Sequence, residues 1–345
     1  MSYQKDTGPE SSPWHGKTGV FLIAEIGGNH EGNFEYAKHL TQLAIDSGVD
    51  AVKFQIYTAD SLVNPIENPQ RYEHFKRFVL KRTEHIALAK ICIKNNVDYI
   101  ASVWDIRAID WIDDYISIYK IGSGDLTAYP IIKSILRKSK PIILSTGMST
   151  LKEVKDAIAY IKSIDSSYIS EKRLALLQCT SAYPLPQADA NLKVIVTLKR
   201  QTNLPVGYSD HTTGSKALEI AVALGAEILE FHFTDTRVGK KFRDHKVSLI
   251  KDEVLRLKRS MAEIKNLLGD GIKRVMPAER DNRRTFRRAV YPAISLPKGS
   301  VLTKDKLFCL RPNHGVDARD YDKIVKKRTT KRLARHEKIN KDILS

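Results

Sequence analysis

The sequence predicts an α/β protein, built as a (β/α)₈ TIM barrel that is followed by a small β-rich domain. Eight short runs of β-forming residues recur between residues 20 and 232, and segments with helical spacing separate them. This alternation is typical of a parallel barrel, although an open doubly wound sheet gives a similar pattern. Residues 284–345 alternate short apolar runs with Pro-Lys-Gly and similar turns, and they are too few to add another α/β layer.

The predicted strands are short apolar, β-branched or aromatic runs bounded by turn formers. They lie at residues 20–26, 50–56, 97–103, 117–121, 141–145, 173–178, 204–208 and 226–232. Helices are predicted where apolar residues recur at three- and four-residue spacing, and Gly48 and Gly225 end two of them. The clearest helices are 34–47, 84–95, 151–163, 215–224 and 252–268.

Domain boundaries are predicted where this periodicity stops. Residues 1–17 are polar and are expected to form an N-terminal extension of a catalytic barrel at 18–268. The stretch GDGIKRVMPAERDN holds Gly, Pro and charges without periodicity, so 269–283 is predicted to be a linker. Residues 284–345 then form the small domain.

Composition indicates a cytoplasmic protein. The N-terminus lacks the apolar core of a signal peptide, and there is no run of about 18 apolar residues, so no membrane span is expected. Cys92, Cys179 and Cys309 are far apart and odd in number. They fit free thiols in a reducing compartment better than disulfides or a zinc cluster.

Positive charge is concentrated near the C-terminus. Residues 271–345 hold 21 Lys or Arg and 8 Asp or Glu, and so carry 13 of the chain's 17 net positive charges. Three interpretations stay open: a nucleic-acid-binding domain, a solvated basic surface, and a field that attracts small anionic substrates.

The strand at 50–56 carries Lys53 and Gln55 among apolar residues. Because a parallel strand is covered on both sides, an unpaired ammonium there is expensive, and an anionic partner is expected for Lys53. Chemistry in TIM barrels lies at the C-terminal ends of the strands. Polar residues at all eight strand ends therefore imply a common pocket: Glu25, Asn29, Lys53, Gln55, Ser102, Asp105, Lys120, Ser123, Asp125, Ser145, Ser181, Tyr183, Ser209, His211 and His232.

These residue types indicate an anion site and a metal site. Lys53 and Lys120, flanked by serines and glycines, suit a phosphate and a carboxylate. His211 and His232 end neighbouring strands and are expected to share one divalent cation. A serine hydrolase is disfavoured, since the Ser, Asp and His of GYSDH are consecutive and their side chains diverge. A Schiff-base lysine, as in class I aldolases, stays open.

Several linked motifs occur in a fixed order along the chain: AEIGGNHEG, VKFQIYTADSLV, YKIGSGDLTAYPII, KPIILSTGMSTLKEV, LLQCTSAYPLP, GYSDHTTG and HFT. Together they resemble the sialic acid synthase family, which comprises the N-acetylneuraminate synthases and their nonulosonate relatives. The closing segment, with LRPNHG and KRLARHEKINKDIL, resembles the antifreeze-like SAF domain that follows the barrel in that family. The resemblance covers nearly the whole chain from about residue 18.

The resemblance implies a reaction in which phosphoenolpyruvate condenses with an N-acylated mannosamine-type sugar. A nine-carbon α-keto acid and phosphate are formed, and the C–O bond of phosphoenolpyruvate is cleaved. A divalent cation, Mn²⁺ or Mg²⁺, is implied on His211 and His232. The implied partners are the two substrates and a second copy of the chain in a domain-swapped homodimer. No membrane partner is expected, and nucleic acid is disfavoured as a partner, although binding through the basic C-terminal domain is kept as an alternative.

The resemblance and the expected chemistry together assign a role to each candidate, and substrate becomes the expected partner of Lys53. The catalytic groups are expected to be Glu25, Asp125 and His232. Phosphoenolpyruvate is expected to contact Lys53, Ser102, Lys120, Ser123, Ser145, Ser181 and Ser209. The sugar is expected to contact Gln55, Tyr183, Asp244 and, from the partner's SAF domain, Arg311.

Some stretches depart from the family pattern. HFT is followed by DTRVGKKFRDHKVSL, which is richer in cations than the PGPDH string of many members. Asn64 and Asn68 are equal candidates for the asparagine that family members direct to the sugar from the loop after strand two. The sequence leaves open which acylated amino sugar is used.

Overall fold

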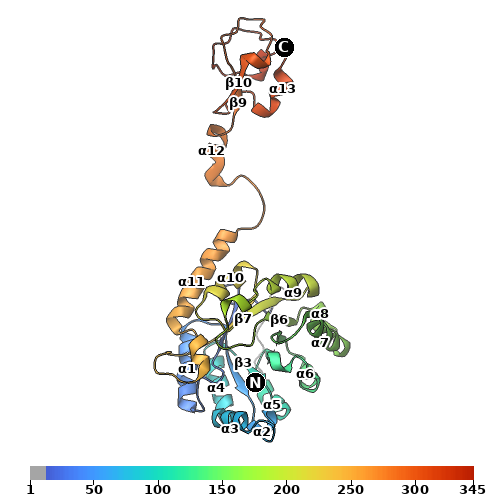
Figure 1. The fold of residues 1–345 in the computed structure, drawn as a ribbon, viewed down its shortest axis with the longest axis vertical. Coiled ribbons are helices and arrows are strands. Elements are labelled where there is room, and N and C mark those ends of the chain that lie inside the picture. Colours follow the sequence, from blue (N-terminus) through green and yellow to red (C-terminus); the bar gives the residue numbers. More distant parts are fainter. Residues whose placement is uncertain (1–12) are drawn as a thin grey trace. The chain divides into compact units, whose positions relative to one another are not determined.

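The structure is a computed structural model that describes residues 13–345, and it confirms a closed barrel followed by a small second domain (Figure 1). The chain divides into two compact units, Met1–Gly269 and Asp270–Ser345, and each is described by itself. Residues 1–12 of the predicted N-terminal extension lie outside the described residues.

Eight parallel strands pair in chain order, and β8 closes the barrel on β1. They are β1 (Phe21–Glu25), β2 (Ala51–Ile56), β3 (Asp98–Val103), β4 (Tyr119–Ile121), β5 (Ile142–Ser145), β6 (Leu174–Gln178), β7 (Val206–Asp210) and β8 (Ile228–His232). All eight predicted strands are present, and their boundaries differ from the prediction by at most two residues.

Helices surround the barrel (Figure 1). The five clearest predicted helices appear as α1 (Phe34–Asp46), α4 (Arg82–Lys94), α7 (Leu151–Ile164), α10 (Lys216–Ala223) and α11 (Lys251–Leu268). Shorter helices are α2 (Ala59–Leu62), α3 (Pro69–Phe78), α5 (Ile106–Ile112), α6 (Tyr129–Leu136), α8 (Ser167–Ser170) and α9 (Val194–Thr202). In residues 13–345, no helix has the length and apolar character needed to cross a membrane.

Side chains alternate between the two faces of each strand, and this alternation positions the polar residues. On β2, Phe54 packs outward among the helices, whereas Lys53 and Gln55 face the barrel interior. On β8, Glu230 and His232 face inward in the same way. Beneath them, an apolar layer fills the barrel: Trp14, Phe21, Ile23, Ala51, Ile100, Ile118, Ile143, Ala175, Leu177 and Ile228.

Trp14 belongs to this apolar layer although it precedes the first strand. Its side chain is 1% exposed, and its indole Nε1 donates a hydrogen bond to the carbonyl oxygen of Lys172 at 2.7 Å. Trp14, which falls in the predicted N-terminal extension, is therefore part of the barrel core.

The second unit has its own small core. Strands β9 (Ala289–Pro292) and β10 (Leu307–Leu310) form an antiparallel pair, and α12 (Arg280–Thr285) and α13 (Tyr321–Ile324) are its helices. Isolated bridges between loops complete the domain. The buried residues are Val290, Leu296, Leu302, Leu307, Val316, Ile324, Leu333, Ile339 and Ile343.

Candidate active site

A cavity of about 550 Å³ lies at the C-terminal ends of the barrel strands. Each of the eight strands, or the loop that follows it, contributes side chains to the lining, as the barrel architecture predicts. Nearly all of the predicted site residues line it: Glu25, Lys53, Gln55, Ser102, Lys120, Ser123, Asp125, Ser145, Ser181, Tyr183, Ser209, His211, His232 and Asp244.

Strand register explains why these side chains converge. Glu25 of β1 lies beside Lys53 of β2 on one side and beside His232 of β8 on the other. In the same way, Ser102 of β3 lies beside Lys120 of β4. Because inward-facing residues of a closed barrel stack in layers, these side chains form one polar layer above the apolar one.

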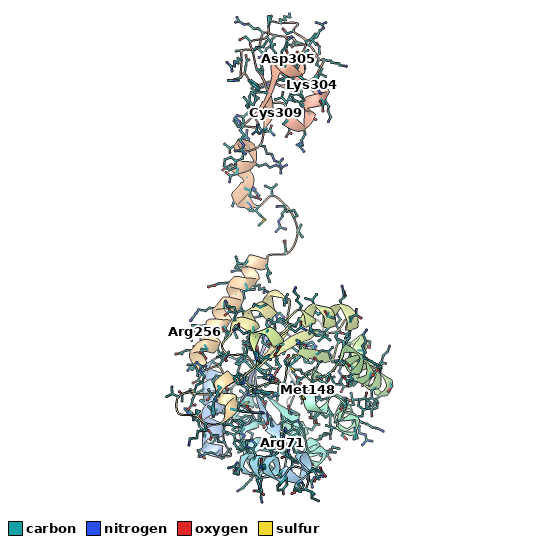
Figure 2. All side chains as sticks on the ribbon, in the orientation of Figure 1. Arg71, Met148, Arg256, Lys304, Asp305 and Cys309 are labelled. Atoms are coloured by element: carbon teal, nitrogen blue, oxygen red, sulfur yellow. The ribbon has the colours of Figure 1, made fainter. Side chains whose placement is uncertain are left out.

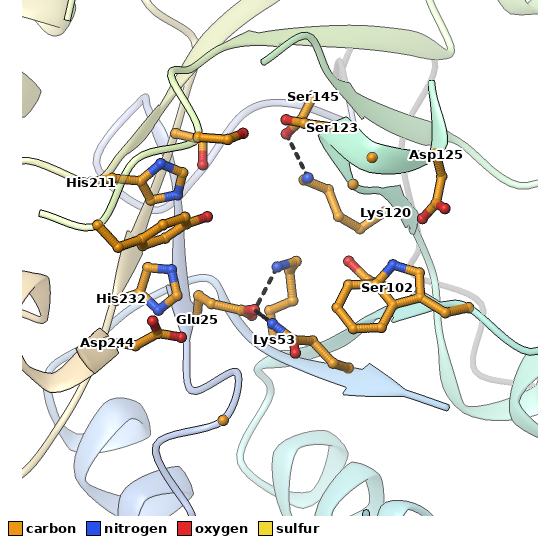
Figure 3. A pocket seen from close by; sticks show the side chains of 18 of the residues that line it. Glu25, Lys53, Ser102, Lys120, Ser123, Asp125, Ser145, His211, His232 and Asp244 are labelled. Carbon is orange, nitrogen blue, oxygen red and sulfur yellow. Dashed lines mark hydrogen bonds and ion pairs between the residues drawn. The ribbon is translucent and has the colours of Figure 1, made fainter. Parts of the chain in front are cut away.

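Lys53, Lys120, Glu25 and Glu230 form a buried ionic centre. The Lys53 ammonium lies 2.8 Å from Glu25 Oε2 and 3.5 Å from Glu230 Oε2, and the Lys120 ammonium lies 3.7 Å from Glu230 Oε1. Lys120 also donates a hydrogen bond to Ser145 Oγ at 2.6 Å. Figure 3 shows the two lysine side chains reaching into the same space from different strands.

The pKa values within the ionic centre follow from burial and from the pairing of charges. Burial alone would lower the pKa of Lys53, but the Glu230 and Glu25 carboxylates raise it overall. Burial lowers the pKa of Lys120, Glu230 opposes this shift, and the Lys53 charge reinforces it. Burial would raise the pKa of Glu230, but the two ammonium groups hold it well below its ordinary value. We infer that the centre contains charged groups in the resting protein.

Glu230 is the residue that the sequence analysis missed. The prediction considered polar residues where strands end, and in EILEFH only His232 met that criterion. The alternation of side chains along a strand could have identified it. Glu230 precedes His232 by two residues, so both side chains face the interior. In the structure Lys53 pairs with Glu25 and Glu230, because an unpaired buried ammonium would be strongly destabilising. Its contact with an anionic substrate stays a prediction.

A cradle of small polar groups lies near Lys120, formed by Ser123, Gly147, Cys179 and Ser181. The backbone N–H of Gly147 donates a hydrogen bond to Ser123 Oγ at 3.1 Å, and this oxygen lies 3.0 Å from Cys179 Sγ. A Cβ atom on Gly147 would lie 2.7 Å from Ser181 Oγ and 2.8 Å from Ser123 Oγ, so any other residue would displace one of these hydroxyl groups. Hydroxyl and N–H donors beside an ammonium are suited to a phosphate group.

His211 and His232 lie on one side of the cavity, with ring centres 5.5 Å apart (Figure 3). The Nδ1 of His211 lies 2.7 Å from the carbonyl oxygen of Thr180, so Nδ1 carries the proton and Nε2 is free to bind a ligand. Burial, reinforced by His232, lowers the pKa of His211 to about 3, and the ring is therefore neutral. The Nδ1 of His232 is buried, and no described residue forms a hydrogen bond with it.

The two imidazoles fit a divalent cation that keeps open coordination positions. No group of three or more His, Cys, Asp or Glu side chains is arranged to hold a metal ion in the part of the chain that the structure describes. The two imidazoles would thus leave the remaining positions to water and substrate oxygens, as in catalytic sites. The Tyr183 ring packs against both, at 4.1 Å from the His211 ring centre and 5.6 Å from that of His232.

Asp125 lies across the cavity from the two histidines (Figure 3). Burial raises the pKa of its carboxyl group from 3.8 to about 6, although the Lys120 charge and a hydrogen bond from Trp104 oppose the shift. A carboxyl group with a pKa near 6 exchanges protons readily close to neutral pH.

The outer part of the cavity is aromatic and cationic. Phe78 of α3 packs on Phe242 of the β8–α11 connection, with ring centres 4.9 Å apart. The guanidinium carbon of Arg243 lies 4.7 Å from the centre of the Tyr183 ring. Its Nε donates a hydrogen bond to Asp244 Oδ1 at 3.0 Å, which fixes the Asp244 carboxylate at the cavity wall.

Gln55 lines the cavity and donates a hydrogen bond to Glu25 Oε1 at 2.9 Å. The remaining candidates lie elsewhere. Asp105 caps α5 and does not line the cavity. Asn68 caps α3, and Asn64 accepts hydrogen bonds within its own turn, so neither asparagine lines the cavity. Arg311 lies in the second unit, where its guanidinium carbon is 5.6 Å from the ring centre of Phe286.

Comparisons with known proteins agree with this architecture. The NeuB family model matches residues 40–273, and the SAF domain model matches residues 287–344. N,N'-diacetyllegionaminic acid synthase of Legionella pneumophila is 35% identical over 327 residues, which cover 91% of each chain. Human N-acetylneuraminate-9-phosphate synthase is 30% identical over 305 residues, covering 85% of this chain and 83% of the human one.

A solved structure shares the fold as well. The N-acetylneuraminic acid synthetase of Leptospira borgpetersenii, in complex with citrate, matches with a TM-score of 0.69 and 29% identity, over 76% of this chain and 90% of that one. The two buried lysines, the hydroxyl-lined cradle and the paired imidazoles lie together at the barrel mouth, where TIM-barrel enzymes have their active sites. The chain belongs to the NeuB family, whose relatives named above are synthases of nonulosonic acids, and its second unit is a SAF domain.

Proposed function

We propose that this enzyme condenses phosphoenolpyruvate with an N-acylated mannosamine-type sugar to give a nine-carbon α-keto acid and phosphate. The observation that carries the proposal is the convergence of Lys53 and Lys120 in one cavity, beside the hydroxyl and N–H groups of the cradle. Phosphoenolpyruvate carries about three negative charges near neutral pH. Charge-assisted hydrogen bonds, each contributing ~1.5–3 kcal/mol, would contribute to holding it there.

The charge of the ionic centre supports a requirement for a divalent cation. With all four side chains ionised, the two ammonium and two carboxylate charges cancel, so the centre alone offers a trianionic substrate no net positive charge. A cation on His211 and His232 would supply two positive charges next to Glu25, the β-sheet neighbour of His232. We therefore propose Mn²⁺ or Mg²⁺ as the cofactor, and expect phosphoenolpyruvate to bind more weakly without it.

When bound, the cation would act as a Lewis acid on the aldehyde oxygen of the open-chain sugar. C3 of phosphoenolpyruvate forms a bond to the aldehyde carbon, and the aldehyde oxygen takes up a proton. Water adds to C2 and gives up a proton, and the C2–O bond to the phosphoryl group then breaks. Phosphate leaves with the bridging oxygen and takes up the proton of the C2 hydroxyl group, so that C2 becomes the keto carbon.

The chain supplies groups for each of these tasks. Lys53 and Lys120 bind the anionic substrate and balance the charge that moves onto the departing phosphate. Glu25 and Asp125 are the two carboxylates that we assign to proton transfer with the attacking water and the new hydroxyl group. Gln55, Tyr183 and Asp244 are assigned to the sugar.

We also propose a domain-swapped homodimer in which Arg311 reaches the sugar in the partner's barrel. The match of residues 287–344 to the SAF domain model supports this proposal. The thiols Cys92, Cys179 and Cys309 are all free, which supports a cytoplasmic location.

The test is an assay of phosphate release from phosphoenolpyruvate with a panel of acylated amino sugars and either cation. Release that depends on all three components is expected. A Schiff-base aldolase is the second candidate, because Lys120 is a buried amine with a lowered pKa. A Schiff-base mechanism predicts that borohydride traps a lysine when pyruvate is present, and that the enzyme stays active in the presence of chelator. These two results together would overturn our proposal.

We expect Gly147→Ala to raise the KM for phosphoenolpyruvate about 10- to 100-fold, the loss associated with one charge-assisted hydrogen bond. The added methyl group would displace Ser123 or Ser181 from the cradle. Initial rates of phosphate release against phosphoenolpyruvate concentration measure the effect. Gly124→Ala is the matched control, since its Cβ would meet no atom within 4 Å. An unchanged KM in a folded Gly147→Ala variant would contradict the assignment of the cradle.

Asp125→Asn is expected to remove the acid limb of the pH–rate profile. The ionised carboxylate, needed to accept a proton, is lost as the pH falls through about 6 in the wild-type protein. The folded-state pKa lies above the ordinary value, so the wild-type protein loses stability as the pH rises from about 4 to about 6, and the loss is complete above that. The variant should therefore be more stable than wild type by up to about 3 kcal/mol at pH 8, with little difference at pH 4.

Steady-state rates and urea unfolding at several pH values measure both effects of Asp125→Asn. Asp252→Asn, an exposed change on α11, is the control and should alter neither. Persistence of the same acid limb in Asp125→Asn would rule out this carboxyl group as its source.

A further inference from the structure

Two arginines line the outer part of the cavity, and the proposed function as stated uses neither. Arg243 belongs to the β8–α11 connection and Arg71 to α3, and both are exposed at the cavity wall. We propose that they bind a phosphate group on the terminal carbon of the acceptor, so that the acceptor is an N-acylated hexosamine 6-phosphate. This inference rests on the proposed function and specifies its second substrate.

Arg243 is held in a defined orientation close to the reacting end of the cavity. Its guanidinium stacks on the Tyr183 ring at 4.7 Å, and Tyr183 in turn packs on His211 with ring centres 4.1 Å apart. One aromatic ring therefore separates the guanidinium from the imidazoles where the aldehyde oxygen is expected. A guanidinium on an aromatic face keeps its N–H edge directed outward, where it can bind an oxyanion through two hydrogen bonds.

Arg71 supplies a second positive charge from a separate element. Its guanidinium carbon lies 5.4 Å from the ring centre of Phe75, one turn further along α3. No carboxylate among residues 13–345 forms an ion pair with Arg71. Helix α3 has no buried residue, yet it directs Phe75 and Phe78 to the cavity, so its main packing surface is the cavity wall. Figure 2 labels Arg71 on this part of the barrel.

The charges of Arg71 and Arg243 both affect one residue of the cavity wall, His74. The pKa of His74 is lowered by burial and further by the charges of Arg77, Arg243 and Arg71. Asp244 balances one of these charges and leaves the outer wall with a positive excess. An uncharged sugar gives no reason for this excess, whereas a phosphate dianion does.

The positions of the two anionic groups follow from the length of the sugar. Phosphoenolpyruvate occupies the inner end, where Lys53 and Lys120 lie, and the sugar aldehyde must approach the imidazoles beside it. The carbon furthest from the aldehyde then points to the outer wall. A phosphate on that carbon would meet Arg71 and Arg243, and the same phosphate would remain on the nine-carbon product.

The test compares N-acetylmannosamine 6-phosphate with N-acetylmannosamine as acceptors for the full-length protein, with phosphoenolpyruvate and Mn²⁺ present. We expect kcat/KM to be about 10- to 100-fold higher for the phosphorylated acceptor. Arg71→Ala and Arg243→Ala should each reduce that preference by about tenfold or more, mainly through the KM of the phosphorylated acceptor.

The matched control is Arg256→Ala, which removes one exposed arginine from α11, outside the cavity lining (Figure 2). It should leave the preference between the two acceptors unchanged. Because Arg71, Arg243 and Arg256 are all exposed, the three variants should unfold at temperatures close to that of wild type, and this is measured alongside.

The outcomes separate this inference from the proposed function. Release of phosphate with N-acetylmannosamine or a diacetamido-trideoxyhexose in preference to the 6-phosphate would overturn the inference and leave the proposed function standing. An equal loss for both acceptors in the arginine variants would also overturn it. No release with any acylated acceptor would instead overturn the proposed function.

Discussion

Glu230→Gln is expected to lower the free energy of unfolding by about 3–5 kcal/mol and to abolish measurable phosphate release. The carboxylate lies within 3.5 Å of the Lys53 ammonium and 3.7 Å of that of Lys120, and all three side chains are buried. Removing its charge leaves two ammonium groups facing one remaining carboxylate, that of Glu25. Urea unfolding at neutral pH measures the loss of stability.

A double variant distinguishes charge imbalance from loss of packing. Glu230→Gln combined with Lys120→Met removes one charge of each sign, so the two charged residues that remain in the centre balance each other. The double variant should be more stable than Glu230→Gln alone and equally inactive, since Lys120 is assigned to substrate binding. If Glu230→Gln unfolds like wild type, or if the double variant is the less stable of the two, the buried ionic centre does not govern stability as described.

Removal of the divalent cation should reduce the rate of phosphate release by at least about 10³-fold, because charge stabilisation on the reacting aldehyde would be lost. His211→Ala and His232→Ala should have effects of similar size that added Mn²⁺ does not reverse. Rates are measured after dialysis against chelator and again after Mn²⁺ is restored, and Mn²⁺ binding is measured directly by calorimetry.

His39→Ala is the control for the histidine variants, since His39 is exposed on α1 and does not line the cavity. It should bind Mn²⁺ and turn over like wild type. Full activity of the chelated protein, or wild-type Mn²⁺ binding by His211→Ala, would refute the assignment of these imidazoles.

The barrel could be predicted from sequence because each of its strands has a recognisable local sequence pattern. Each is a short apolar run followed by a turn and an amphipathic helix, and eight such repeats in one chain suggest closure. The inward position of Lys53 was predictable for the same reason, since the alternation of side chains is a local property of β2. Boundaries at β7 were less certain, because Ser209 and Asp210 are polar yet still pair with β8.

The partner of Lys53 was not predictable in the same way. Its pairing with Glu230 spans the barrel from β2 to β8 and exists only because the sheet closes. Likewise, the contact of Ser123 with Cys179 joins loops that are 56 residues apart, and the lining role of Arg71 depends on a short helix in an irregular connection. Such long-range contacts cannot be read from composition or periodicity, because they depend on strand register and on how the loops pack in the closed barrel.

The tryptophan that precedes the first strand has a consequence for how this enzyme can be shortened or redesigned. Because the Trp14 indole occupies the barrel beneath the ionic centre, a chain trimmed to start at residue 18 would leave a hole at the base of the cylinder. Solvent entering there would raise the effective dielectric constant around Lys53 and weaken its coupling to both glutamates. Trp14 thus shields the buried ionic centre from solvent, although it lies outside every β/α repeat.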